Sequence, residues 1–193
     1  NGAHCYLLVY VDDILVACID ATICQSVKDL LLSIFDGRDL GSAESFLGIH
    51  IVRDRINRTI KLCHSRMVSD LVHRFGLENG NARLLPLTAS VHMSASDGEP
   101  LDTSTYPYRE LVGSLMHLAV TVRPDIAFAV GALARFMSVP TSVHWQAAKG
   151  VLRYLAGTAD VGIVFGRPVF VADATVSSVV AFQTSGAYGG DGG

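Results

Sequence analysis

Two adjacent carboxylates, Asp12 and Asp13, are the residues whose type and spacing most clearly suggest chemistry. They follow Tyr10 and Val11 inside an apolar stretch that runs from Cys5 to Ile19. A buried carboxylate is costly without a partner, and Mg²⁺ compensates it well because this ion prefers oxygen ligands. Two-metal sites use such acids to hold the attacking and leaving oxygens of a phosphoryl transfer. On spacing alone, a tight turn is the simpler interpretation, since Asp also favours turns.

The elements around the acid pair decide whether both side chains can reach one metal ion. Neighbouring side chains of a strand point to opposite faces. Short β-rich runs on both sides of Asp12 and Asp13 predict a hairpin with the acids near its turn. The pair can therefore share a metal site only if the hairpin turns there, and we expect a third carboxylate to come from another strand.

A basic stripe between His50 and Phe75 is a second candidate site. Its members are Arg53, Arg55, Arg58, Lys61, Arg66 and Arg74. They could meet a phosphate backbone, where such contacts position the protein rather than read sequence. They could equally be the solvated charges that protect the edge of a sheet. The residues alone leave both interpretations open.

Composition and charge narrow the class of protein. The chain has 193 residues, of which 50% are hydrophobic, so one domain or two small ones with a real core are expected. The net charge of −3 gives no global basic field for nucleic acid. No apolar run approaches the ~20 residues that span a bilayer, so no membrane partner is expected.

The cysteines and histidines lack zinc-ligand spacing, and a reduced intracellular chain is the simpler prediction. The cysteines are Cys5, Cys18, Cys24 and Cys63.

Hydrophobic periodicity predicts strands and helices along most of the chain. After the first hairpin (5–19) the prediction is a helix (22–35), a turn between Gly37 and Gly41, strands 45–52 and 59–63 forming a second hairpin, and a helix (65–75). Residues 79–107 are rich in Ser, Thr, Asn, Gly and Pro and are the best candidate linker. Helices 108–121, 124–137 and 142–155 and strands 161–165 and 169–172 follow. The aromatic side chains predicted for the core are Phe128, Phe136 and Trp145.

Three blocks together resemble the reverse transcriptase of copia-type retrotransposons. The first, LLVYVDDILVA (7–17), resembles polymerase motif C. The second, FDGRDLGSAESFLGIHI (35–51), is similar to the family's D-L-G and F-L-G-I region. The third (108–157) is the most specific, because YRELVGSLM, RPDIAFAVG and HW…LRYL…GT occur in the family's order and spacing.

The resemblance implies roles for individual residues. Asp12 and Asp13 match the motif C pair that holds catalytic Mg²⁺ (Mn²⁺ is possible) in the palm, and Tyr10 matches the aromatic residue near the primer end. The hairpin 46–62, and in it Phe46, Leu47, Gly48 and Lys61, resembles the primer grip that contacts nucleic acid. The helix after this hairpin would begin the thumb, and residues 108–157 resemble the region that leads toward RNase H.

Departures from the family pattern set limits on activity. The resemblance implies a further catalytic Asp from motif A and a fingers region upstream, and we expect both to be missing from this chain. Arg38 stands near the position of a motif D Lys, but arginine is a poor proton donor. Asp173 matches the first RNase H carboxylate, whereas Thr175 replaces the second acid. A working RNase H site is therefore not expected.

The sequence thus predicts a mixed α/β (α+β) fold. A partial palm and thumb start (1–78) would be followed by a linker (79–107), a helical connection-like region (108–166) and a degenerate or truncated RNase H start (167–193). The parent activity would be RNA-directed DNA synthesis on an RNA template with a DNA primer, inside the cell, in a cytoplasmic virus-like particle or in the nucleus. This chain is expected to be inactive alone, and to bind Mg²⁺ productively only if a partner segment supplies the missing fingers and palm carboxylate. The alternative is a non-catalytic remnant that acts as a nucleic-acid-binding or helical interaction module.

Overall fold

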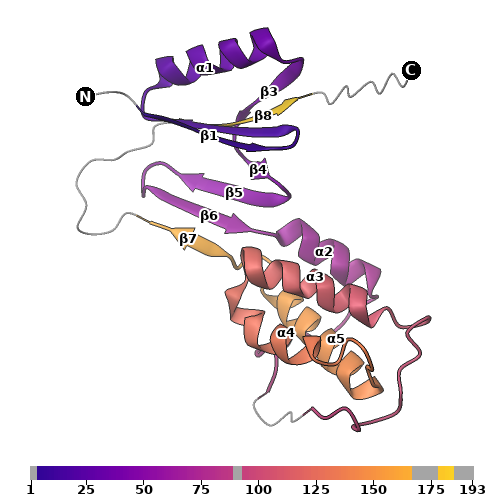
Figure 1. Ribbon diagram of the computed structural model, residues 1–193. Coiled ribbons are helices and arrows are strands. Elements are labelled where there is room, and N and C mark those ends of the chain that lie inside the picture. The colour runs from indigo at the N-terminus through magenta and orange to yellow at the C-terminus, as the bar shows by residue number, and fades with distance from the viewer. Residues whose placement is uncertain (1–3, 89–92, 167–177, 185–193) are drawn as a thin grey trace, which may run out of the picture. The chain divides into compact units, whose positions relative to one another are not determined.

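The computed structural model describes residues 4–88, 93–166 and 178–184 (Figure 1). The chain divides into two compact units, one made of residues 1–60 with 165–193 and the other of residues 61–164. Small antiparallel sheets and several helices make up the chain, which confirms the predicted mixed α/β class. The predicted division into four segments stays a prediction.

The first unit contains a sheet with the strand order β1-β2-β8-β3. Strands β1 (Cys5–Tyr10) and β2 (Asp13–Cys18) pair antiparallel as the predicted first hairpin. Strand β3 (Gly37–Ser42) lies where a turn was predicted, and that prediction is wrong. The stretch is short and polar, and it becomes a strand by pairing with β8 (Ser178–Thr184), which is far away in the sequence. Such tertiary pairing overrides local preference.

Helix α1 (Ala21–Ile34) follows β2 as predicted. It begins at Asp20, whose side chain accepts a hydrogen bond of 2.7 Å from the Thr22 backbone N–H, an arrangement that stabilises a helix N-terminus. Cys24 and Leu31 of this helix are buried in a small core with β2. Leu30 and Ile34 are exposed, because the buried stripe of α1 is narrower than its apolar pattern.

The segment predicted as one strand over 45–52 is a tight hairpin. Strand β4 (Ser45–Phe46) pairs with β5 (Ile49–Asp54), with Phe46 opposite Ile49. The two turn residues, Leu47 and Gly48, have φ angles of 51° and 78°. Positive φ at both positions is typical of two-residue hairpin loops. Strands β6 (Thr59–Cys63) and β7 (Ile163–Phe165) complete a second sheet with the order β4-β5-β6-β7, so the predicted second hairpin is present as β5 and β6.

The second unit is built on a helical core. Its helices are α2 (Ser65–Arg74), α3 (Tyr108–Thr121), α4 (Ala127–Ala134) and α5 (Ser142–Gly157), with a short 3-10 turn η1 (Pro124–Ile126) before α4. All four helices lie close to their predicted ranges, although α4 is shorter. Among the described residues between α2 and α3 there is no helix or strand, yet Leu87, Met93 and Leu101 pack against the core. None of the helices in the described part of the chain is both long and apolar enough to span a bilayer.

The predicted core aromatics have three different environments. Trp145 is buried and meets Phe75 edge-on at 5.9 Å between ring centroids, so this prediction is confirmed. Phe136 is half-buried and stacks on His144 at 3.9 Å. Phe128 is 82% exposed, and its assignment to the core was wrong. Helix α4 is apolar all round (AFAVGALA), so its pattern cannot indicate which face is buried.

The cysteines also differ from expectation. Cys5 and Cys18 are bonded as a disulfide that joins the two strands of the β1–β2 hairpin, whereas Cys24 and Cys63 are free and buried. The prediction of a fully reduced chain is therefore wrong for the first pair. Cysteine spacing alone does not indicate this bond, because the two residues become directly opposite only through the hairpin register. Their Cα atoms are 4.3 Å apart.

Candidate metal and nucleic-acid site

The β1–β2 turn brings together Tyr10, Asp12 and Asp13. Tyr10 ends β1 and lies opposite Asp13, which begins β2. Val11 and Asp12 form the turn, with Val11 in the left-handed region at φ 50°. The reversal falls at the acid pair, as required for both carboxylates to approach one ion.

The surroundings of this turn differ from the apolar setting that the sequence suggests. Asp12 is exposed and Asp13 is half-buried. The apolar residues before them are exposed as well, with Val11 at 81% and Leu8 at 54%. No large burial penalty therefore has to be compensated at this turn. The premise of acids held among buried apolar neighbours is wrong on the β1 side of this turn, where the apolar side chains are exposed to solvent, whereas Ile14 after the turn is buried.

The carboxylate oxygens of this turn are the type of ligand that a hard divalent cation prefers, but two carboxylates are too few to form a complete site. Asp12 and Asp13 offer carboxylate oxygens, the ligands that Mg²⁺ prefers. Within the described ranges, no group of three or more His, Cys, Asp or Glu residues is placed to hold a metal ion. The expected third carboxylate is thus not supplied by the described part of this chain.

The other predicted nucleic-acid residues lie at different places. Phe46, Leu47 and Gly48 make the β4–β5 turn, in the same unit as the acid pair. Lys61 is half-buried on β6 and belongs to the second unit. Asp173 lies outside the described residues. The β1–β2 turn therefore brings Asp12 and Asp13 together with Tyr10. The residues predicted for the primer grip lie elsewhere, in the β4–β5 turn and on β6.

The loop between β5 and β6 carries part of the basic stripe and is organised by Asp54. The Asp54 carboxylate accepts hydrogen bonds from the backbone N–H groups of Ile56 and Asn57, both at 2.9 Å, and from the Asn57 side chain at 2.6 Å. These bonds lower the pKa of Asp54 below its ordinary value. The loop that places Arg55 and Arg58 is thus held by one acidic side chain, a role that the charge count did not reveal.

An organised charge cluster in the second unit was missed by sequence reasoning. Arg123, only 1% exposed, donates through Nε and Nη2 to the two carboxylate oxygens of Asp125 at 2.9 and 2.7 Å. Its Nη1 donates to the Thr158 carbonyl at 2.9 Å, and its Nη2 also reaches the Thr158 hydroxyl at 2.7 Å. The Tyr154 hydroxyl donates to Asp125 at 2.8 Å. Although partial burial raises the pKa of Asp125, the bonds from Arg123 and Tyr154 lower it below the ordinary value.

This cluster explains the most specific block of the sequence. Arg123 and Asp125 come from RPDIAFAVG, Tyr154 from LRYL and Thr158 from the following G-T. A bidentate arginine–carboxylate pair is both strong and geometrically demanding. The presence of these three pieces in the order and spacing of the family that the sequence resembles was the available signal, but sequence alone could not show that they meet.

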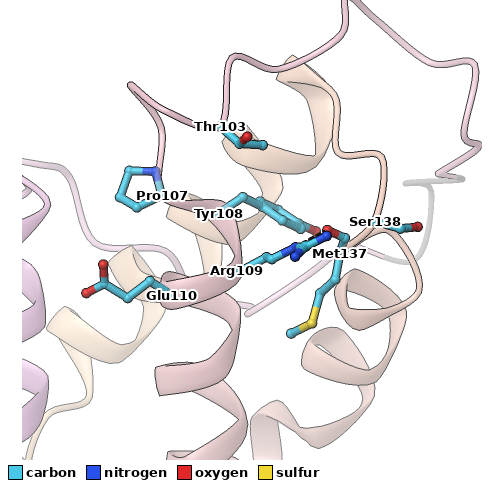
Figure 2. Close-up of a pocket in the computed structure, with 7 residues that line it drawn as sticks. All are labelled: Thr103, Pro107, Tyr108, Arg109, Glu110, Met137 and Ser138. Carbon is cyan, nitrogen blue, oxygen red and sulfur yellow. Dashed lines mark hydrogen bonds between the residues drawn. The ribbon is translucent and has the colours of Figure 1, made fainter.

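A cavity of about 380 Å³ lies at the start of α3 in the second unit. Figure 2 shows Arg109 reaching across it toward Met137, whose carbonyl accepts a 2.8 Å hydrogen bond from the arginine Nε. Glu110, also in its lining, pairs with Arg74. None of the residues predicted for metal or nucleic-acid binding lines this cavity.

Comparisons with known proteins identify relatives for most of the chain. Residues 2–89 match the family model described as reverse transcriptase (RNA-dependent DNA polymerase). The Pol polyprotein from transposon TNT 1-94 of Nicotiana tabacum is 38% identical over 165 residues, covering 83% of this chain and 12% of the relative. The Pol polyprotein from transposon RE1 of Arabidopsis thaliana is 40% identical over 158 residues, covering 82% and 10%.

A putative transposon Ty5-1 protein of Saccharomyces cerevisiae is 34% identical over 153 residues, covering 79% of this chain and 49% of the relative. The chain thus spans about a tenth of the length of the two Pol polyproteins. No solved structure matches it.

Proposed function

Because the chain belongs to the reverse transcriptases of copia-type retrotransposons, we propose that it carries the metal-binding acids of an RNA-directed DNA polymerase and works only as part of the larger enzyme. The observation that carries this proposal is the hairpin reversal at Asp12 and Asp13, inside the segment that matches the family model. A turn that leaves one carboxylate exposed and the other half-buried lets an ion from solvent reach both side chains.

We assign the parts of the chain to the polymerase as follows. The β1–β2 hairpin with α1 is part of the palm, and Tyr10 lies near the primer end. The β4–β5 turn with Phe46, Leu47 and Gly48 and the following strands form the primer grip, in which Lys61 contacts nucleic acid. Helix α2 begins the thumb. The support for these assignments is the order of the family motifs along the chain.

The acid pair would hold Mg²⁺ once a further carboxylate is supplied by another segment of the polyprotein. Bound Mg²⁺ supplies charge neutralisation at the phosphate that reacts with the primer hydroxyl. Asp12 and Asp13 would orient that ion, and Tyr10 would position the primer terminus beside them. Two carboxylates hold such an ion weakly, because Mg²⁺ demands near-octahedral oxygen coordination. The chain alone is therefore expected to be inactive.

Primer extension tests this proposal with two proteins. One is the chain as it stands, and the other is a chimera that adds the region upstream of the matching segment in the tobacco relative. Only the chimera should make template- and Mg²⁺-dependent DNA. Asp12→Asn or Asp13→Asn in the chimera should lower the rate at least about 1,000-fold, since several kcal/mol of charge stabilisation are lost. The exposed Asp160→Asn is the matched control.

Two results would contradict the proposal. Synthesis by the unextended chain would overturn its inactivity. Undiminished synthesis by the Asp13→Asn chimera would overturn the assignment of the metal-binding pair.

A further inference from the structure

Strand β8 joins a sheet whose other strands all come from the first quarter of the chain. Its neighbours β2 and β3 end at Cys18 and Ser42, whereas β8 begins at Ser178. The whole second unit, residues 61–164, lies between them in the sequence. The β8 strand also lies outside residues 2–89, which match the polymerase family model. A distant segment therefore completes the sheet that carries the acid pair.

The pairing of β8 is extensive on both of its edges. Along one edge, Asp13 through Cys18 of β2 face Gln183 through Ser178 in antiparallel register. Along the other, Gly37 through Asp39 of β3 face Thr184 through Phe182, and Ser42 faces Val180 after a shift in register. Ala181, in the middle, is 5% exposed. The strand is thus an internal strand of the sheet, and it separates β2 from β3.

Removing β8 from this sheet would leave two strand edges with room for one strand between them. An open edge presents unpaired N–H and C=O groups and is a template for another extended segment. Backbone hydrogen bonds supply most of the affinity in such strand addition. The gap between β2 and β3 offers this pairing on two sides at once, which a free outer edge such as that of β1 does not.

We infer that the position between β2 and β3 is a strand-acceptor site, which β8 fills within its own chain and which the β8 strand of a second copy can fill in its place. Identical strands make identical contacts, so exchange between copies changes no pairing and is a low-cost route to a dimer. The partner is an extended segment that runs antiparallel to both neighbours.

The acceptor site also determines what faces the metal-binding turn. In the register of β8, Gln183 is the residue opposite Asp13. A β8 strand supplied by a second copy would place the same residue opposite Asp13, so exchange would leave the acid turn intact. That consequence rests on the proposed function, whereas strand exchange itself does not and is tested without any measurement of activity.

The test uses the full chain and a fluorescent peptide with the sequence of residues 178–184. A strand tethered in its own chain acts at an effective concentration on the order of 1 mM, so it competes with the free peptide. Ala181→Pro removes a ladder N–H from the internal strand and should release it. The variant should bind the peptide at least about tenfold more tightly than the wild-type chain. Ala181→Gly, which keeps the N–H, and a peptide that carries the Ala181→Pro change are the matched controls.

Exchange between copies is read from mixtures. The Ala181→Pro chain has an open acceptor but no competent donor strand, so it should stay monomeric alone and capture the wild-type chain when the two are mixed. Equal peptide binding by the wild-type, Ala181→Gly and Ala181→Pro chains, or binding by none, would overturn the inference. So would capture of one Ala181→Pro chain by another.

Hydrogen exchange of the wild-type chain gives a reading that does not depend on the variants folding. The amides of β8 should lose protection before those of the β1–β2 hairpin, because β8 leaves the sheet while the hairpin stays paired. Simultaneous loss of protection in β8 and in that hairpin would show that β8 is not exchangeable, and would sink the proposal.

Discussion

Asp12 and Asp13 in the first unit and Asp125 in the second are carboxylates within the family motifs, and their surroundings differ. Asp12 is exposed and Asp13 half-buried in a hairpin turn. Asp125 accepts from Arg123 and Tyr154, and Arg123 is almost fully buried. A carboxylate whose oxygens are already held by a buried arginine is committed to the fold. Asp12 and Asp13 lie instead in a turn that an ion from solvent can reach.

The two regions show that the residues of a sequence motif can serve either the fold of their own unit or a site that needs other groups. The RPD and LRYL pieces of the third block are explained within this chain, because their side chains bond to one another in the second unit. The Tyr-Val-Asp-Asp piece is not explained by its own surroundings. The described part of the chain contains no group of three or more potential metal ligands, so the proposed site needs a further carboxylate from another segment.

The largest expected effect is on the stability of the second unit. Arg123→Ala removes a buried guanidinium that bridges Asp125 and Thr158, and should destabilise this unit by about 3 kcal/mol. Trp145, the single tryptophan, is buried in that unit and reports its unfolding by fluorescence in a urea titration. The double variant Asp12→Asn/Asp13→Asn should change the free energy of unfolding by less than about 0.5 kcal/mol, since these residues lie at a surface turn. Equal losses from both variants would erase the distinction between the two regions.

The pH dependence of stability should also distinguish the two regions. The pKa of Asp125 is lower in the folded chain than its ordinary value of 3.8. Its ionised form therefore stabilises the folded state above that value, and this contribution is lost as the pH falls through the lower, folded pKa. Unfolding of the second unit, followed by Trp145 fluorescence between about pH 5 and pH 2, should show this loss. In Asp125→Asn the curve should be flatter over the same range, and an unchanged slope would contradict the assignment.

A third carboxylate placed beside Asp13 should raise the affinity of the β1–β2 turn for a divalent cation. Gln183 faces Asp13 in the sheet register, so Gln183→Asp sets two acids at directly opposed positions, about 5 Å apart at Cβ. One added charge at this range in a water-like dielectric is worth about 1–2 kcal/mol toward a divalent cation, or roughly tenfold in affinity. Mn²⁺ binding followed by electron paramagnetic resonance measures the gain.

The neighbouring Thr184→Asp is the matched control for this variant. Consecutive residues of a strand point to opposite faces, so the control adds the same charge away from Asp13. It should leave Mn²⁺ affinity unchanged. An equal gain in both variants would indicate general attraction by charge instead of a shared site.

The helices and strands that depend on contacts between residues close in the sequence could be predicted. The first hairpin, α1 and the helices of the second unit follow from alternation, helical periodicity and residues such as Asp20 that favour helix ends. Prediction failed where partners lie far away in the chain. Strand β3 depends on β8, the Cys5–Cys18 bond depends on register, and the Arg123 cluster joins three separate motif pieces. The exposure of β1 could not be predicted either, because an apolar run has the same pattern whether or not another element covers its side chains.

The smallest expected effect concerns the backbone of the acid turn itself. Val11 adopts φ 50°, a left-handed conformation that costs a β-branched residue about 1–2 kcal/mol. The Val11 side chain is largely exposed, so Val11→Gly loses little burial and relieves this strain. The flexibility of glycine in the unfolded chain offsets about 0.5–1 kcal/mol of the stability gained. The net gain should be about 0.5 kcal/mol, read from the protection of the β1–β2 amides in hydrogen exchange. Val9→Gly, in the adjacent strand where φ is not positive, should instead destabilise the hairpin. If both variants lose protection equally, the turn is unstrained, and the position of the two carboxylates owes nothing to the backbone at Val11.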